Sequence, residues 1–364
     1  MSATEVTETG VAETGVTETG VTEAGVTETG VAETGVTDAG VAETGVTETR
    51  ATETGEVHRI TTGEVELEAA VLSPTVGDPA DAPVVLLLSG LGSQRTEWPA
   101  ELLDGLRAAG CRLVTMDNRD CGRSTSMDER PGDASDLERW LRGEPFAAPY
   151  RLRDLAGDAV AVLDHLDVEV AHVVGRSMGG MIAQHLAIAW PQRTASLVSL
   201  MSTTGAEGVG GPWPDALAAM AQPTPETREE VIEAGVARAR VTNSPTLFDE
   251  DRVRARLAAS YDRAHHPQGT TRQLLAIVSD EDRTPLLAQL STPTLVIHGT
   301  QDALVDVSGG RATAEAIPDA NLLELEEMGH DLPVPLLPIV TAAVAGHVWR
   351  SEGTHGSLGS SRVS

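Results

Sequence analysis

The stretch Gly175-Arg176-Ser177-Met178-Gly179-Gly180 decides the fold of this 364-residue chain. Before it stands a short apolar run, residues 171–174, that is typical of a buried strand, and after it residues 181–190 have the pattern of a helix. Strand, Gly-x-Ser-x-Gly and helix are the context of a nucleophile elbow, where a serine hydroxyl projects from a sharp turn. Gly175 and Gly179 fit this geometry, because a Cβ at either position would collide with the neighbouring strand or helix. The stretch therefore predicts that Ser177 is a nucleophile.

Strands that alternate with helices surround this stretch, over residues 56–202 and again over 284–350. Such alternation predicts an α/β fold, with a mostly parallel central sheet and helices on both faces. We expect strands at 57–61, 65–72, 83–88, 112–116, 171–174, 195–201, 292–299 and 321–325, and helices at 98–109, 152–163, 181–190 and 336–349.

Between residues 203 and 283 the alternation stops. Four helical segments, punctuated by prolines, are expected there at 213–221, 225–240, 249–264 and 270–282. An all-helical insertion between two strands of a sheet is interpreted as a lid. At the other end of the core, residues 351–364 are rich in glycine and serine and are expected to form a flexible C-terminal tail.

Residues 6–55 repeat a five-residue unit, beginning with Val6-Thr7-Glu8-Thr9-Gly10. A period of five matches neither helix nor strand, and each unit offers almost no apolar surface to bury. Residues 1–55 carry a net charge of −10 out of −29 for the whole chain. We expect a disordered acidic tail without a part in the chemistry. An arm that contacts other proteins or aids solubility is the alternative.

The composition narrows the classes of partner. Strong net acidity argues against nucleic acid and anionic membrane surfaces, because phosphate contacts need basic patches. Without a signal peptide or a long apolar run, we expect a cytoplasmic protein with no membrane partner. The two cysteines, Cys111 and Cys121, have no metal-ligand spacing and are expected to be free thiols, so no metal is expected. The oligomeric state is not predicted.

Two residues complete a catalytic constellation with Ser177. A serine hydroxyl needs an adjacent base, and the base needs an acid that orients it. Asp302 follows the predicted strand that ends at His298-Gly299, and His330 follows the predicted strand 321–325. Both should lie at the carboxyl edge of the sheet, where parallel sheets place their ligands. The chain order serine, aspartate, histidine is the order expected for this architecture.

From about residue 64 to 349, the chain resembles an α/β-hydrolase with a helical lid. The stretches that carry this resemblance are Gly175–Gly180, His298-Gly299-Thr300-Gln301-Asp302, Gly329-His330-Asp331-Leu332-Pro333 and the turn Asp117–Ser124. Within this fold family, it resembles the aclacinomycin methylesterase-like hydrolases.

The resemblance implies a cofactor-free serine hydrolase that acts on a carboxylic ester of a small or medium-sized molecule. Ser177 would be the nucleophile, His330 the general base and Asp302 the orienting acid. The backbone N–H groups of Met178 and Leu91 are the expected oxyanion donors. Many family members have His-Gly in the loop before Leu91, whereas this chain has Ser89-Gly90.

Several alternatives stay open. The same serine chemistry serves lactone, thioester and carbon–carbon bond hydrolysis and cofactor-free perhydrolysis, and a ligand-binding protein of this fold is a further possibility. Arg176 could face the pocket or bind a neighbouring carboxylate. Asp117 and Arg119 are expected to brace their loop. The remaining histidines are expected to be structural or exposed, namely His172, His185, His265, His266 and His298.

Overall fold

The computed structural model describes residues 55–130, 132–222 and 225–359. The predicted repeat tail therefore lies outside the described residues, except for Gly55. The described strands are β1 (Glu56–Thr62), β2 (Val65–Leu72), β3 (Val84–Leu88), β4 (Arg112–Met116), β5 (Ala171–Arg176), β6 (Thr194–Leu200), β7 (Thr294–Gly299) and β8 (Asn321–Leu325).

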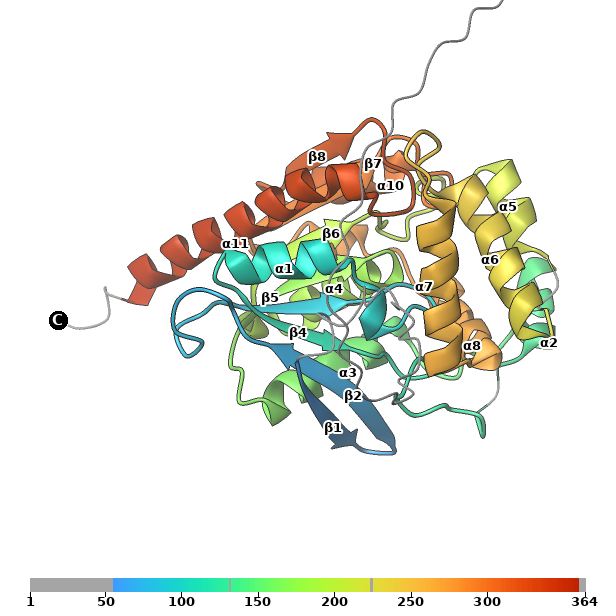
Figure 1. The fold of residues 1–364 in the computed structure, drawn as a ribbon, viewed down its shortest axis with the longest axis horizontal. Coiled ribbons are helices and arrows are strands. Elements are labelled where there is room, and N and C mark those ends of the chain that lie inside the picture. The colour runs from blue at the N-terminus through green and yellow to red at the C-terminus, as the bar shows by residue number, and fades with distance from the viewer. Residues whose placement is uncertain (1–54, 131, 223–224, 360–364) are drawn as a thin grey trace, which may run out of the picture. The chain divides into compact units, whose positions relative to one another are not determined.

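These strands form one sheet in the order β1-β2-β4-β3-β5-β6-β7-β8 (Figure 1). The hairpin β1–β2 adds to β4 in antiparallel pairing, and all pairs from β4 to β8 are parallel. The predicted α/β architecture is confirmed. Because the strands from β3 onward are parallel, the loops that follow β3, β5, β7 and β8 meet at one edge of the sheet.

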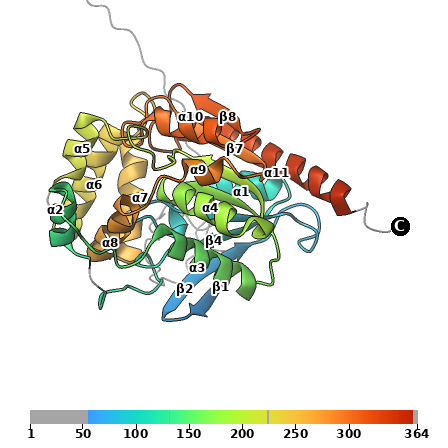
Figure 2. The same ribbon diagram turned by 180° about the vertical axis from the view of Figure 1, so that it is seen from behind.

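Helices cover both faces of the sheet (Figures 1 and 2). The helices outside the insertion are α1 (Ala100–Ala108), α2 (Ala134–Leu141), α3 (Leu152–His165), α4 (Met178–Ala189), α9 (Thr284–Leu287), α10 (Val307–Ala316) and α11 (Leu337–Gly359), with short 3₁₀ helices at Arg95–Glu97, Pro191–Arg193 and Val334–Leu336. On one face, α1 and α11 pack against apolar residues of the sheet. On the other face, α3 and α4 bury their apolar sides in a second cluster.

The segment between β6 and β7 contains the four expected helices α5 (Pro214–Met220), α6 (Arg228–Thr242), α7 (Glu250–Arg263) and α8 (Pro267–Val278). Buried ion pairs attach the last two to loops of the sheet. Arg263 of α7 lies 2.7 Å from the carboxylate of Asp117, and Arg272 of α8 lies 2.6 Å from that of Asp120. The insertion is therefore anchored to the core at charged contacts as well as apolar ones.

Three helices, α2, α9 and α10, are not predicted from the sequence pattern. Helix α10 contains Gly309 and Gly310, which lower helix propensity. The structure explains both glycines by close packing. A Cβ on Gly310 would lie 2.4 Å from Nδ1 of His298, and one on Gly309 would lie 2.8 Å from Cβ of Thr203. Tertiary contacts thus determine this helix against local propensity.

The C-terminal boundary placed at residue 350 is wrong, because α11 continues to Gly359. Ser351 is buried, and its hydroxyl donates to the carbonyl of His347 at 2.9 Å. Glu352 lies 2.9 Å from Nε2 of the buried His172. The burial of Ser351 and the contact of Glu352 with His172 thus hold against the core a sequence that, by its glycine and serine content, indicates a tail.

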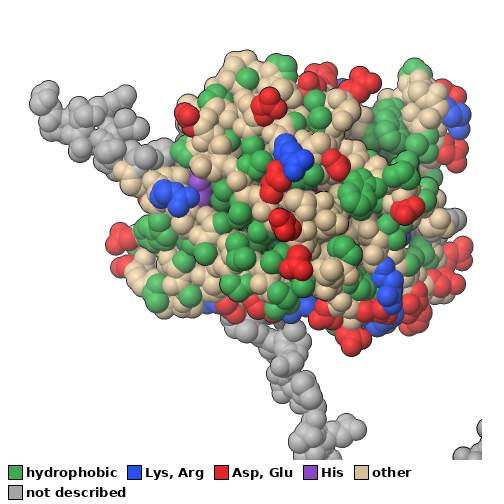
Figure 3. Space-filling view, turned by 90° about the horizontal axis from the view of Figure 1, so that it is seen from above, with side chains coloured by type: hydrophobic (Ala, Val, Ile, Leu, Met, Phe, Trp, Pro, Cys, Tyr) green, Lys and Arg blue, Asp and Glu red, His purple; other side chains and the backbone are tan. Residues whose placement is uncertain are grey.

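Some further properties concern the described residues as a whole. Cys111 and Cys121 are free thiols, as expected. Both are buried, and burial raises the pKa of both thiols. Within the ranges given above, no helix combines the length and apolar character needed to cross a bilayer. Acidic side chains are scattered over the face in Figure 3, with few arginines among them.

Candidate active site

Ser177 sits at the tip of a sharp turn between β5 and α4. Its backbone has φ 56° and ψ −122°, a conformation that is strained for a residue with a Cβ. The flanking glycines are required sterically. A Cβ on Gly175 would lie 2.1 Å from the carbonyl oxygen of Gly179, and one on Gly179 would lie 2.0 Å from that of Leu88 in β3. The elbow therefore packs directly against its own helix and the adjacent strand.

The structure brings Ser177, His330 and Asp302 into one hydrogen-bonded line. Nε2 of His330 lies 3.0 Å from Oγ of Ser177, and Nδ1 of His330 lies 2.8 Å from Oδ2 of Asp302. Because a carboxylate can only accept, the imidazole donates through Nδ1, and Nε2 is left to accept from the serine hydroxyl. The loops after β5, β7 and β8 supply one residue each.

The environment of Asp302 keeps it ionised. Its side chain is fully buried, which opposes ionisation, but the charge of His330 and hydrogen bonds from His298 and His330 outweigh burial and lower its pKa to about 2. Its other carboxylate oxygen accepts from the backbone N–H groups of Leu304 and Val305, at 3.0 and 2.8 Å. A buried, fixed negative charge thus faces the imidazole.

His298, expected from the sequence to be structural or exposed, also contacts Asp302, which we do not predict from the sequence. Nε2 of His298 donates to the carbonyl of Val305 at 2.7 Å and lies 3.4 Å from Oδ2 of Asp302. It is fully buried at the end of β7. His298 therefore fixes the turn that presents Asp302. Its position in the run His298–Asp302, four residues before the acid, is the sequence feature that could have indicated this contact.

The end of α6 shapes the histidine loop. The N–H of His330 donates to the carbonyl of Thr242 at 2.7 Å, and the N–H of Gly329 donates to Oγ of Ser244 at 2.9 Å. The carboxylate of Asp331 accepts from the N–H of Ser244 at 2.9 Å, and burial raises its pKa. A helix of the insertion therefore positions His330, which no local sequence pattern indicates.

The loop after β3 lies against the serine. A Cβ on Gly90 would come within 3.2 Å of Cβ of Ser177. The N–H groups of Met178 and Leu91 make no hydrogen bond to any other residue that the structure describes. Met178 is the first residue of α4, where N–H groups have no partner within the helix. Within the described residues, neither N–H group is therefore engaged by the protein itself.

Helix α8 holds this loop in place. The buried side chain of Gln273 accepts from the N–H of Gly92 at 2.8 Å and donates to the carbonyl of Arg119 at 2.8 Å. As expected, Asp117 and Arg119 brace their own loop. Arg119 pairs with Asp158 at 2.6 and 2.7 Å, and Asp117 accepts from backbone N–H groups on both sides of it.

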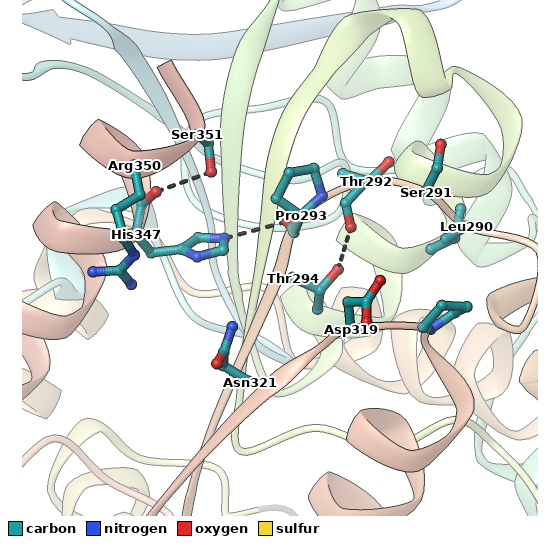
Figure 4. A pocket seen from close by; sticks show the side chains of 11 residues that line it. Leu290, Ser291, Thr292, Pro293, Thr294, Asp319, Asn321, His347, Arg350 and Ser351 are labelled. Carbon is teal, nitrogen blue, oxygen red and sulfur yellow. Dashed lines mark hydrogen bonds between the residues drawn. The ribbon is translucent and has the colours of Figure 1, made fainter. Parts of the chain in front are cut away.

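A crevice of about 420 Å³ lies at the opposite edge of the sheet (Figure 4). It is lined by residues at the start of β7 and β8, among them Thr294 and Asn321, and by His347 of α11. Asp302 and His330 follow the carboxyl ends of these two strands, so this crevice is separate from the site around Ser177.

The sequence model of the alpha/beta hydrolase fold family matches residues 83–334 of this chain. The rhodomycin D methylesterase of Streptomyces sp. strain C5 is 34% identical over 312 residues, covering 77% of this chain and 95% of that protein. The rhodomycin D methylesterase of Streptomyces peucetius is 32% identical, with the same coverage. Among solved structures, the enol-lactonase of Burkholderia xenovorans LB400 has a TM-score of 0.61 at 22% identity, covering 80% of this chain and 99% of that one.

The chain therefore belongs to the α/β hydrolase family. Within it, the chain is similar to methylesterases over most of its length, in agreement with the resemblance drawn from its motifs.

Proposed function

We propose that this protein is a serine hydrolase that cleaves a carboxylic ester of a small or medium-sized organic molecule through an acyl-enzyme. The observation that carries the proposal is the hydrogen-bonded line from Ser177 through His330 to Asp302. Similarity to two methylesterases supports ester hydrolysis over the other serine chemistries.

In the proposed mechanism, Oγ of Ser177 attacks the ester carbonyl while Nε2 of His330 takes its proton. The N–H groups of Met178 and Leu91 bind the resulting oxyanion. The tetrahedral intermediate then collapses, and His330 gives the proton to the departing alcohol. Water, deprotonated by His330, hydrolyses the acyl-enzyme and restores the serine. Asp302 stays ionised throughout and stabilises the charged imidazole.

The relatives are named for the hydrolysis of a methyl ester, so we propose a methyl ester, with methanol as leaving group, as the first substrate class to test. We assign the chemistry to core segments 56–202 and 284–350. The insertion 203–283 acts as a lid over the substrate, and residues 1–55 supply no group to the reaction.

The test is labelling with a fluorophosphonate probe, together with hydrolysis of short p-nitrophenyl esters. We expect wild type to label and turn over. Ser177→Ala and His330→Ala should lose labelling and about 10⁴- to 10⁶-fold in kcat/KM, because the triad acts as a unit. The exposed Ser135 provides a control, and Ser135→Ala should label like wild type. A folded wild type that does not label would contradict the proposal and favour a ligand-binding protein.

A further inference from the structure

Arg176, in the elbow itself, has no part in the mechanism above. Its guanidinium lies over the ring of Trp98, 5.2 Å from the ring centroid, and the residue is only partly accessible. No hydrogen bond or ion pair joins this guanidinium to any residue that the structure describes. Of the two possibilities left open by the sequence, pairing with a carboxylate of the protein is therefore excluded for the described residues.

The carboxylates around Arg176 are already bound by other groups. Glu97 pairs with Arg256 of α7 and accepts from Oγ of Ser260 at 2.9 Å. Asp331 is bound by Ser244. Both carboxylates raise the pKa of Arg176 through their charge alone, without a hydrogen bond to it, whereas the charge of Arg256 lowers that pKa. The five N–H donors of the guanidinium therefore remain available to a ligand, although other charged side chains surround the group.

The charge of this side chain persists at neutral pH. Burial lowers the pKa of Arg176 to about 10, and the residue therefore remains protonated well above pH 7. A guanidinium with free donors matches a carboxylate in geometry, with two parallel hydrogen bonds. The planar group is already held by its contact with Trp98, which reduces the entropy lost on binding.

We propose that Arg176 binds a carboxylate of the substrate, so that the preferred esters carry a second, acidic group close to the bond that is cleaved. The proposal rests on the proposed ester hydrolysis at Ser177. Arg176 directly precedes Ser177 in the chain, and the charged residues that act on it come from the loop after β3, the histidine loop and α7. An acid held by Arg176 would therefore belong to the same small molecule as the ester carbonyl. Its surroundings agree with this function. Trp98 follows the oxyanion loop, and Asp331 follows the catalytic histidine.

The experiment compares acidic and neutral esters on the same enzyme. One pair differs on the leaving-group side, 4-acetoxybenzoate against 4-acetoxybenzamide. The other differs on the acyl side, the mono-4-nitrophenyl ester of adipic acid against 4-nitrophenyl hexanoate. Arg176→Met should lower kcat/KM about 10- to 100-fold for the acidic member of at least one pair, with less than about threefold change for the neutral member. Arg176→Lys should fall between, because it keeps the charge and loses the fork.

Arg153 provides a matched control, since it is exposed and lies over Trp190 at 5.9 Å. Arg153→Met removes the same charge and the same kind of contact, and should leave the ratio of acidic to neutral turnover unchanged. Equal losses on both members of each pair for Arg176→Met would overturn the inference, as would a wild type that labels with fluorophosphonate but hydrolyses neither acidic ester. Absence of labelling in wild type would instead contradict the proposed function.

Discussion

Two aspartates lie close to the imidazole, and their surroundings give them opposite properties. Asp302 is fully buried, but charge and hydrogen bonds from histidines lower its pKa to about 2. Asp331 is next to His330 in sequence, yet burial raises its pKa, and it accepts from Ser244 rather than from the imidazole. Position after a strand, rather than proximity in sequence, therefore singles out Asp302 as the proposed orienting acid.

These differences predict the effect of changing each aspartate to asparagine. Asp302→Asn should lower kcat about 10³- to 10⁴-fold, because the amide no longer holds the Nδ1–H tautomer or stabilises the imidazolium. Asp331→Asn keeps an acceptor for Ser244 and should lower kcat less than about tenfold. Steady-state kinetics on a p-nitrophenyl ester measures both. Similar losses for the two variants would contradict the assignment of Asp302.

At the scale of elements, helices of the insertion hold two of the loops that carry the proposed catalytic groups. The end of α6 binds the histidine loop through the N–H of His330, and α8 binds the loop of Leu91 through Gln273. A rigid oxyanion site needs such support, because its donors act only where they are fixed before reaction. The insertion therefore holds these loops in place, in addition to the role of lid proposed for it.

Gln273 allows this support to be tested. Gln273→Met has a similar length but leaves the N–H of Gly92 without its acceptor, and should lower kcat/KM about tenfold while the free energy of unfolding falls by about 1–3 kcal/mol. Gln273→Glu keeps the acceptor for Gly92, but it loses the donor to Arg119 and places an ionisable carboxyl group in a fully buried site. Compared with Gln273→Met, this variant should recover more of the lost kcat/KM than of the lost free energy of unfolding. Kinetics and urea unfolding measure the two quantities, and a stability loss without any kinetic loss in Gln273→Met would contradict this positioning role.

At the scale of the whole molecule, the sequence predicts the sheet and the elbow well because both are encoded locally. Apolar runs mark buried strands, and Gly175 and Gly179 mark the close contacts of the turn. What it does not predict depends on contacts between distant segments. Helix α10 forms despite two glycines, because they pack against His298 and Thr203, and α11 extends past residue 350 through contacts with the core. The same limitation conceals the roles of His298 and Gln273.

Stability as a function of pH follows from a histidine remote from the site. His347 of α11 is buried and donates through Nε2 to the carbonyl of Pro293 at 3.2 Å (Figure 4). Burial lowers its pKa to about 4, from an ordinary value of 6.5. Between these two values the unfolded chain binds more protons than the folded one, so the free energy of unfolding falls as pH falls.

The expected loss through this histidine is up to about 3 kcal/mol between pH 6.5 and pH 4. Asp302 adds to it only at lower pH, because its depressed pKa removes stability as pH falls from about 4 to about 2. His347→Gln can keep a donor to Pro293 but does not titrate, so its unfolding free energy should depend less on pH over the first interval than that of wild type. Urea unfolding at pH 7, 5.5 and 4.5 measures this difference. If the free energies of unfolding of wild type and variant fall in parallel with pH, His347 is not the group whose protonation destabilises the fold. A smaller fall for the variant would assign the destabilisation to protonation of His347, in the face of the core that α11 covers.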